Sequence, residues 1–187
     1  MDTKTSLLAG KILLAEPFMM DPNFKRSVVL LCEHEDDQGS LGFILNKPLN
    51  MGIKELISDF PDIDSEVFFG GPVATDTIHY IHCAGDVLDD SLEIHNGIFW
   101  GGDFEKLKFL ISSKVINDKD IRFFVGYSGW SEHQLKEEVK LGSWVVSDMD
   151  SNYIFNPKID NLWKQAMENK GNPFEVIAQM TDYHRLN

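Results

Sequence analysis

The sequence contains few basic residues and no cluster of them. Of its 187 residues, 17 are Lys or Arg and 30 are Asp or Glu, which gives a formal net charge of −13. The three arginines, Arg26, Arg122 and Arg185, are far apart in the chain. Because DNA binding depends on Lys and Arg neutralising phosphates, the composition argues against direct binding to nucleic acid. The same deficit argues against attachment to anionic membrane surfaces.

Cysteines are scarce, and long apolar runs are missing. Cys32 and Cys83 form no C-x-x-C pair, so zinc and thioredoxin chemistry find no support. Each falls in a predicted strand, where a small buried hydrophobic role is expected, and a disulfide between them stays open. Met1–Gly10 lacks the apolar run of a signal peptide, and no segment approaches the roughly 20 apolar residues of a membrane span. We therefore expect a cytoplasmic protein without membrane attachment.

The six histidines show no spacing typical of a metal site. His79 and His82 point to opposite faces of a strand, because side chains alternate along it. His34 lies between two glutamates and points away from both. Asp148–Asn152 begins like a calcium loop, but the glycine and glutamate required further on are missing. The sequence predicts neither a metal nor a cofactor.

Hydrophobic patterning predicts short strands separated by a few helices. Asp36–Ser40 is a turn between two apolar strands, and this is the clearest hairpin in the chain. Asp103 is expected to cap a helix, because an apolar stripe at helical spacing follows it. A capping box at Ser131 and Gln134 opens another helix, which Gly142 ends. The predicted strands are Lys11–Ala15, Ser27–Glu35, Leu41–Asn46, Glu66–Phe69, Thr77–Cys83, Leu92–Trp100, Asp120–Tyr127 and Ser143–Ser147.

The order of these elements fits neither a strict βαβ series nor an all-β protein. The predicted fold class is α+β, with a mixed, largely antiparallel sheet that is strongly curved or barrel-like and helices packed outside it. Met51–Ser58 is expected to form a short helix, and Ile159–Met167 and Phe174–Thr181 to form helices with one apolar face. The length predicts one domain over residues 1–187, with residues 151–187 as a helical C-terminal extension packed on it.

Gly70, Gly71 and Pro72 interrupt two predicted strands. No Gly-Lys-Ser/Thr follows, and Pro72 lacks the backbone N–H that an anion cradle would use, so the segment is not a phosphate loop. Two interpretations remain. The glycines form a sharp corner between strands, or they let a ligand approach the backbone closely.

Gly126–Trp130, G-Y-S-G-W, resembles the G-x-S-x-G nucleophile elbow in its context but not in its pattern. A strand precedes it and a helix follows, as in the elbow. The second glycine comes one position early, and Trp130 fills its place. A close-packed turn anchored by Trp130 is therefore favoured over Ser128 as a nucleophile.

Several segments, between about residue 7 and residue 148, share their order and spacing with one known family. They are Gly10–Pro17, Asp21–Val29, Glu33–His34, Gly42–Pro48, Gly70–Val73 and Gly126–Trp130, followed by Gln134, Leu135, Glu138 and Trp144. Together they resemble the AlgH/YqgE family of bacterial proteins. The resemblance implies an α+β fold whose bifurcated sheet curls into a pseudo-barrel, and it implies no established activity. Some members carry a transcriptional-regulator label without a helix-turn-helix motif, which implies indirect regulation.

A non-enzymatic binding or regulatory role is the leading hypothesis, with an unknown protein or small molecule as the partner. Polar and aromatic residues gather at the ends of predicted elements, where binding sites usually lie. The candidate ligand-binding residues are Asn46, Gly70, Gly71, Pro72, Trp130, Gln134 and Glu138. No catalytic residue is assigned.

Two alternatives stay open. A hydrolase would use Ser128 or His34, and it needs a Ser or Cys within hydrogen-bond reach of a His that a carboxylate orients. A direct DNA-binding regulator would need salt-dependent binding to duplex DNA by the isolated protein.

Overall fold

The computed structural model describes residues 6–155, 159–171 and 174–179, and it contains ten strands within them. The strands are β1 Lys11–Ala15, β2 Val28–Glu35, β3 Gly39–Ile44, β4 Pro48–Gly52, β5 Glu66–Phe69, β6 Val73–His82, β7 Leu92–His95, β8 Ile98–Trp100, β9 Ile121–Trp130 and β10 Trp144–Asp148. The α-helices are α1 Ile53–Leu56, α2 Phe104–Ser112, α3 Gln134–Lys140, α4 Leu162–Asn169 and α5 Phe174–Ala178. Short 3-10 helices cover Ser151–Tyr153 and Ile159–Asn161.

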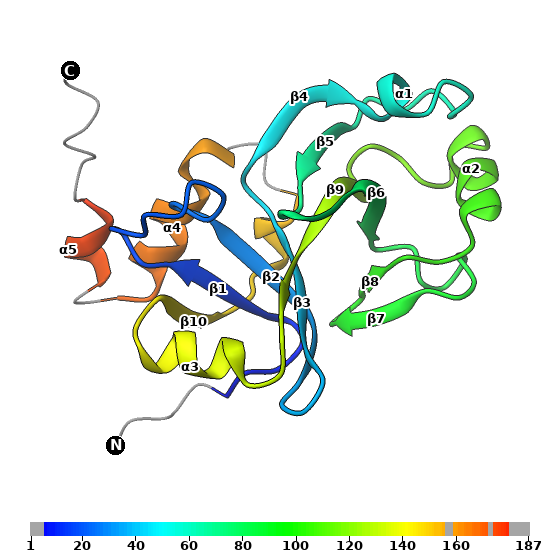
Figure 1. Ribbon diagram of the computed structural model, residues 1–187. Coiled ribbons are helices and arrows are strands. Elements are labelled where there is room, and N and C mark those ends of the chain that lie inside the picture. Colours follow the sequence, from blue (N-terminus) through cyan, green and yellow to red (C-terminus); the bar gives the residue numbers. More distant parts are fainter. Residues whose placement is uncertain (1–5, 156–158, 172–173, 180–187) are drawn as a thin grey trace.

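The sheet is curved and forks at β9 (Figure 1). Its strand order is β10-β1-β2-β3-β9-β6-β8-β7, and β10 and β7 are free edges, so the described strands do not close into a barrel. The end of β9 pairs with β3, while its start pairs with β5, which also carries β4. The β5–β9 pair is parallel and the other pairs are antiparallel. The predicted α+β class with a largely antiparallel, curved sheet is confirmed.

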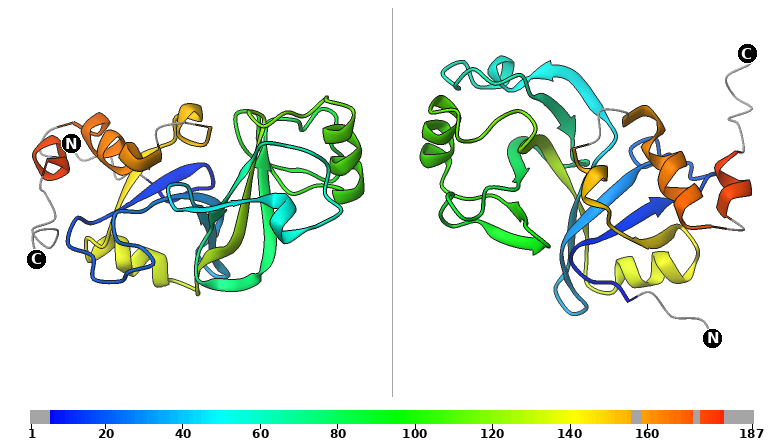
Figure 2. Two further views of the ribbon diagram at one scale, coloured as in Figure 1. Left: turned by 90° about the horizontal axis from the view of Figure 1, so that it is seen from above. Right: turned by 180° about the vertical axis from the view of Figure 1, so that it is seen from behind.

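The strands β1 and β2 are buried on both faces, as their apolar runs predict. Alternate residues point to opposite sides: Ile12 and Leu14 pack into one core cluster, and Leu13 and Ala15 pack into another. The first cluster includes α4 of the tail, and the second includes Leu135 of α3. These two helices lie on opposite sides of this part of the sheet (Figure 2). A third cluster packs α1 and α2 against β5, β6 and the start of β9.

The described part of the tail packs on the sheet. The indole of Trp163 donates to the Ala15 carbonyl at 2.9 Å, and Lys170 Nζ donates to the Val146 carbonyl at 2.7 Å. The apolar stripe predicted for this helix lies in the core at Leu162, Trp163, Ala166 and Met167. The predicted helix over Phe174–Thr181 is described as far as Ala178, and Thr181 lies outside the described residues.

Some predicted boundaries are wrong, each for a local reason. Strand β4, Pro48–Gly52, was not predicted; it pairs only with β5 at an edge, and an edge strand tolerates proline. The predicted helix over Met51–Ser58 shrinks to α1 accordingly. Leu92–Trp100 is a hairpin and not one strand: Asn96 and Gly97 adopt φ of 43° and 77° in an Asn-Gly turn between β7 and β8.

The cysteines are free. Cys32 is buried as expected, but Cys83 is exposed, because β6 ends at His82 and leaves Cys83 in the following loop. Among the described helices, none has the length and apolar character needed to cross a bilayer.

Candidate functional site

An open cleft of about 860 Å³ lies between the β2–β3 hairpin, β7 and the end of β9. Three carboxylates line it, from Glu33 and Glu35 on β2 and from Glu93 on β7. The cleft therefore combines negative charge with apolar surface, and it is called the hairpin cleft below. Its apolar and aromatic lining comes from Leu41, Val73, Leu92, Tyr127 and Trp130.

Three side chains of the β2–β3 hairpin form a continuous polar chain. His34 lies opposite Ser40 in the strand register, and Ser40 Oγ is 2.7 Å from His34 Nδ1. The other ring nitrogen, Nε2, lies 3.3 Å from Asp36 Oδ1 in the turn. The His34 side chain is 9% exposed and that of Asp36 is 52% exposed, so this series of hydrogen-bonding side chains extends from the cleft to solvent.

The charge of Asp36 fixes the direction of these hydrogen bonds. Lys136 donates to the Asp36 carboxylate at 3.2 Å and lowers the pKa of Asp36, with smaller contributions from His34 and His133. An ionised carboxylate only accepts, so the tautomer of His34 that hydrogen-bonds Asp36 carries its proton on Nε2. Nδ1 is then an acceptor, and the Ser40 hydroxyl donates to it. This is the polarity with which a histidine activates a nucleophile.

The structure brings three of the predicted site residues together. Glu138 accepts hydrogen bonds from the indoles of Trp130 at 2.9 Å and Trp144 at 2.8 Å, and from Gln134 Nε2 at 2.9 Å. Gln134 also accepts from the Ser131 backbone N–H, which is one of the two hydrogen bonds of the predicted capping box. The prediction of Ser131 as the N-cap is wrong: the N-cap of α3 is His133, and no side chain caps it, because the Gln134 N–H donates to the Ser131 carbonyl. These contacts join α3 to the ends of β9 and β10. Trp130 is the one predicted site residue that lines the hairpin cleft.

The other predicted site residues contact the protein's own backbone. Asn46 accepts from the Val28 N–H and donates to the Arg26 carbonyl, both at 2.9 Å. A Cβ at Gly70 would lie 2.3 Å from the Gly126 carbonyl oxygen, and one at Gly71 would lie 2.3 Å from the Tyr127 backbone. The backbone that approaches these two glycines so closely is β9.

Pro72 is exposed beside this crossing. It does not line the hairpin cleft, and neither do Asn46, Gly70, Gly71, Gln134 or Glu138. The seven residues therefore do not share this cleft, and ligand binding by them stays a prediction.

Ser128 is fully buried, and its hydroxyl donates to the Gly70 carbonyl at 3.0 Å. Another serine, Ser91, lies 3.3 Å from His82 Nε2, but that nitrogen is 2.8 Å from the Gly101 carbonyl and Nδ1 accepts from a backbone N–H. Burial lowers the pKa of His82, against a smaller opposing effect of the Gly101 hydrogen bond, so the ring is neutral. Within the described ranges, His34 is the histidine that contacts both a hydroxyl and a carboxylate.

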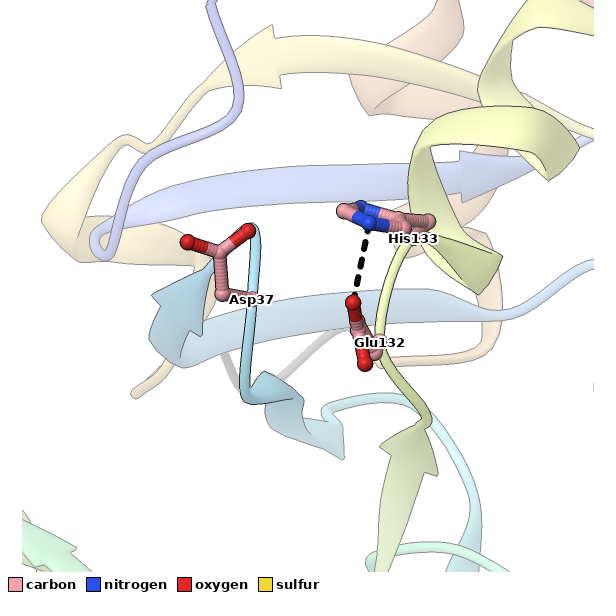
Figure 3. Close-up of side chains that lie close together, drawn as sticks. All are labelled: Asp37, Glu132 and His133. Atoms are coloured by element: carbon pink, nitrogen blue, oxygen red, sulfur yellow. Dashed lines mark ion pairs between the residues drawn. The ribbon is translucent and has the colours of Figure 1, made fainter.

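A group of three exposed side chains near the hairpin tip could contact a cation (Figure 3). The potential ligand atoms of Asp37, Glu132 and His133 lie within 4.8 Å of one another, and His133 Nε2 is 3.0 Å from Glu132 Oε1. Three exposed groups fall short of the four ligands of a structural zinc site. No metal is assigned to them.

Comparison with known proteins identifies the family. The family model described as AlgH-like, DUF179, matches residues 12–175. The chain belongs to the AlgH-like family. It is 43% identical over 188 residues to a UPF0301 protein of Chlorobaculum parvum, and the match covers 100% of both chains. It is 44% identical to a UPF0301 protein of Chlorobium limicola, and that match covers 97% of this chain and 96% of the relative.

Solved structures of similar proteins support the AlgH-like fold. The solution structure of the AlgH protein from Pseudomonas aeruginosa superposes with a TM-score of 0.73 at 25% identity, covering 98% of this chain and 99% of that one. The crystal structure of protein DIP2367 from Corynebacterium diphtheriae gives 0.80 at 19% identity, covering 96% and 95%. The function of the AlgH-like family is not established.

Sequence reasoning missed Ser40 in this AlgH-like chain, because it assigned Ser40 to the turn. The hairpin register was the available signal: β3 starts at Gly39, which places Ser40 directly opposite His34. Glu93 had no comparable signal. Its strand is distant in sequence, and only the tertiary arrangement brings β7 to the hairpin.

Proposed function

We propose that this protein is a non-enzymatic binding protein that holds a small amine with an apolar body in the hairpin cleft. The observation that carries the proposal is the lining of the cleft, in which Glu33, Glu35 and Glu93 adjoin Leu41 and aromatic side chains. Carboxylates attract an ammonium group, and apolar side chains favour burial of a hydrocarbon body. The cleft size of about 860 Å³ lies in the range typical of small-molecule sites.

The charge of the whole chain supports the same ligand class. A net charge of −13 raises the local concentration of cations and repels anions before any contact forms. Among the residues that the structure describes, no lysine or arginine lines the hairpin cleft, so none reverses this preference for cations. We therefore expect the hairpin cleft to select ligands first by their positive charge and then by the apolar contacts that they make.

Calorimetric titration with phenethylamine tests this function. We expect saturable binding of phenethylamine, and much weaker binding of 2-phenylethanol, which has the same ring and chain length but no charge. The double variant Glu33→Gln/Glu93→Gln should weaken phenethylamine binding by on the order of tenfold, since each exposed charge pair contributes up to about 1 kcal/mol.

The matched control is Glu105→Gln, which removes one exposed carboxylate from α2, outside the cleft lining. It should leave phenethylamine binding within about twofold of wild type, because solvent and salt screen a distant surface charge. Equal binding of phenethylamine and 2-phenylethanol would contradict the proposal.

A second candidate function is ester hydrolysis, and the Ser40–His34–Asp36 chain is the observation that favours it. Ser40 Oγ would attack the ester carbonyl carbon while its proton moves to His34 Nδ1. The bond to the alcohol oxygen then breaks, and the alcohol leaves with the proton from His34. Water attacks the acyl-Ser40 ester next, again losing a proton to His34, and the acid is released as the serine is restored.

Covalent labelling with diisopropyl fluorophosphate tests the second candidate. A nucleophilic Ser40 would form a P–O bond and release fluoride and a proton, and mass spectrometry of the digested protein would find the label on Ser40. We expect Ser40→Ala to abolish labelling and His34→Gln to slow it about a hundredfold or more, as for loss of a general base. Ser91→Ala, which alters the serine beside His82, should label like wild type. An unlabelled wild-type protein would exclude hydrolysis at Ser40 without affecting the amine-binding proposal.

Cytoplasmic location, indirect regulation through a protein partner, and the absence of direct DNA binding stay predictions from the sequence. Direct DNA binding receives no support from the hairpin cleft, which is lined by carboxylates.

A further inference from the structure

Arg122 on β9 is a buried cation with few partners. It is 7% exposed, Nη1 donates to the Leu45 carbonyl at 3.2 Å, and the guanidinium carbon lies 4.3 Å from the centre of the Phe68 ring. Within the residues that the structure describes, Arg122 forms no ion pair with a carboxylate. A guanidinium has five N–H donors, and one of them, on Nη1, donates to an acceptor among the described residues. No Arg122 nitrogen is both fully buried and without a partner, so the remaining donors are open to solvent or to a ligand.

Burial makes the lack of a counter-ion costly. It lowers the pKa of Arg122 to about 10, against the opposing attraction of Glu66, so the group is still charged at neutral pH. A charge removed from water without a counter-ion is destabilising, and an oxyanion that accepts two hydrogen bonds from a guanidinium offsets that penalty.

A cavity of about 450 Å³ adjoins Arg122. Phe68 of β5 and Ile121 of β9 line it together with Phe155 and Ile159, which belong to the tail. The cavity shares no lining residue with the hairpin cleft. It is therefore a separate site, with one buried cation, an apolar wall and exposed charged side chains.

We propose that this second cavity, the Arg122 cavity, binds a small monocarboxylate with an apolar body. The carboxylate pairs with the guanidinium, and the hydrocarbon part contacts the apolar walls. Asp64, Glu66 and Asp118 also line the cavity, but all three are exposed, and solvent weakens their repulsion more than it weakens the attraction to buried Arg122. The guanidinium of Arg122 can pair with one carboxylate, and a second carboxylate on the ligand would find no further buried cation in the lining, which favours a single negative charge.

Titration of ¹⁵N-labelled wild-type protein with benzoate tests the proposal. We expect saturable shifts of the backbone amides of Val67–Phe69 and Lys119–Phe123, on the two strands beside the cavity. Benzyl alcohol, which has a similar ring and no charge, should bind at least about tenfold more weakly. Arg122→Lys should weaken benzoate binding at least about tenfold, because an ammonium cannot donate two parallel hydrogen bonds to one carboxylate. Lys119→Gln removes the exposed cation of the same cavity and should change binding less than about threefold.

Three results would overturn the proposal: no saturable shifts with benzoate, equal binding of benzoate and benzyl alcohol, or unchanged binding in folded Arg122→Lys. If Arg122→Lys does not fold, the comparison of benzoate with benzyl alcohol on the wild-type protein still tests whether the cavity selects a carboxylate. Neither ligand depends on the hairpin cleft, so the result is independent of the phenethylamine experiment.

Discussion

Gly70→Ala is expected to lower the free energy of unfolding by about 3 kcal/mol, because the added methyl group overpacks a crossing of two backbones. The new Cβ would lie 2.3 Å from the Gly126 carbonyl oxygen and 3.0 Å from the ring of Phe43. The backbone of Gly70 cannot move away easily, since its N–H donates to the Val125 carbonyl and its carbonyl accepts from the Ile44 N–H. Urea unfolding followed by circular dichroism measures the change.

The control for this prediction is Gly142→Ala, at the end of α3. Gly142 has φ of +82°, but a Cβ there would meet no atom within 4 Å. Its cost is therefore conformational alone, about 1 kcal/mol. Equal losses of stability in the two variants would show that close packing against β9 is not what requires glycine at position 70.

Glu138→Leu is expected to lower the free energy of unfolding by about 2–4 kcal/mol, because two buried indole N–H groups lose their acceptor. Trp130 is 6% exposed and Trp144 is 3% exposed, so water cannot readily replace the carboxylate. The same substitution removes the acceptor of Gln134 and loosens the start of α3. Glu138→Gln keeps one acceptor oxygen and should cost roughly half as much.

Glu137→Leu is the matched control on the same helix. Glu137 is exposed, and its carboxylate lies 3.6 Å from Lys140 Nζ. Its replacement should change the free energy of unfolding by no more than about 0.5 kcal/mol, because exposed ion pairs contribute little. A similar loss in both variants would contradict the assigned role of the Glu138 hydrogen bonds.

The features of the fold that could be predicted are those that depend on residues close together in the sequence, such as strand burial and helix caps. The continuous apolar run in β2 indicated that this strand is buried on both faces. Asp103 was predicted to cap a helix, and it caps α2 by accepting a hydrogen bond from the Lys106 N–H at 2.8 Å. The same local reasoning failed at Asn96 and Gly97, although an Asn-Gly pair is a strong hairpin signal, because the flanking apolar residues were taken as one continuous strand.

The candidate site was predictable in pieces and not as a whole. Trp130, Gln134 and Glu138 lie within nine residues, and a strand end followed by a helical turn brings them together. Gly70 and Gly71 were predicted to form either a sharp corner or a place where a ligand approaches the backbone, and the group that approaches is the backbone of β9, more than fifty residues away in the chain. Periodicity carries no information about which distant strand fills such a gap.

The amino-acid sequence by itself determined most of the strands, the cap of α2, the acidic charge and the family, because these follow from local spacing and composition. The tertiary structure decided which polar groups meet. It set His34 against Ser40 through the strand register, brought Glu93 to the hairpin cleft, and buried Arg122 beside a cavity. The physical reason is that contacts between distant segments depend on the curvature and forking of the sheet, which are set by packing over the whole chain.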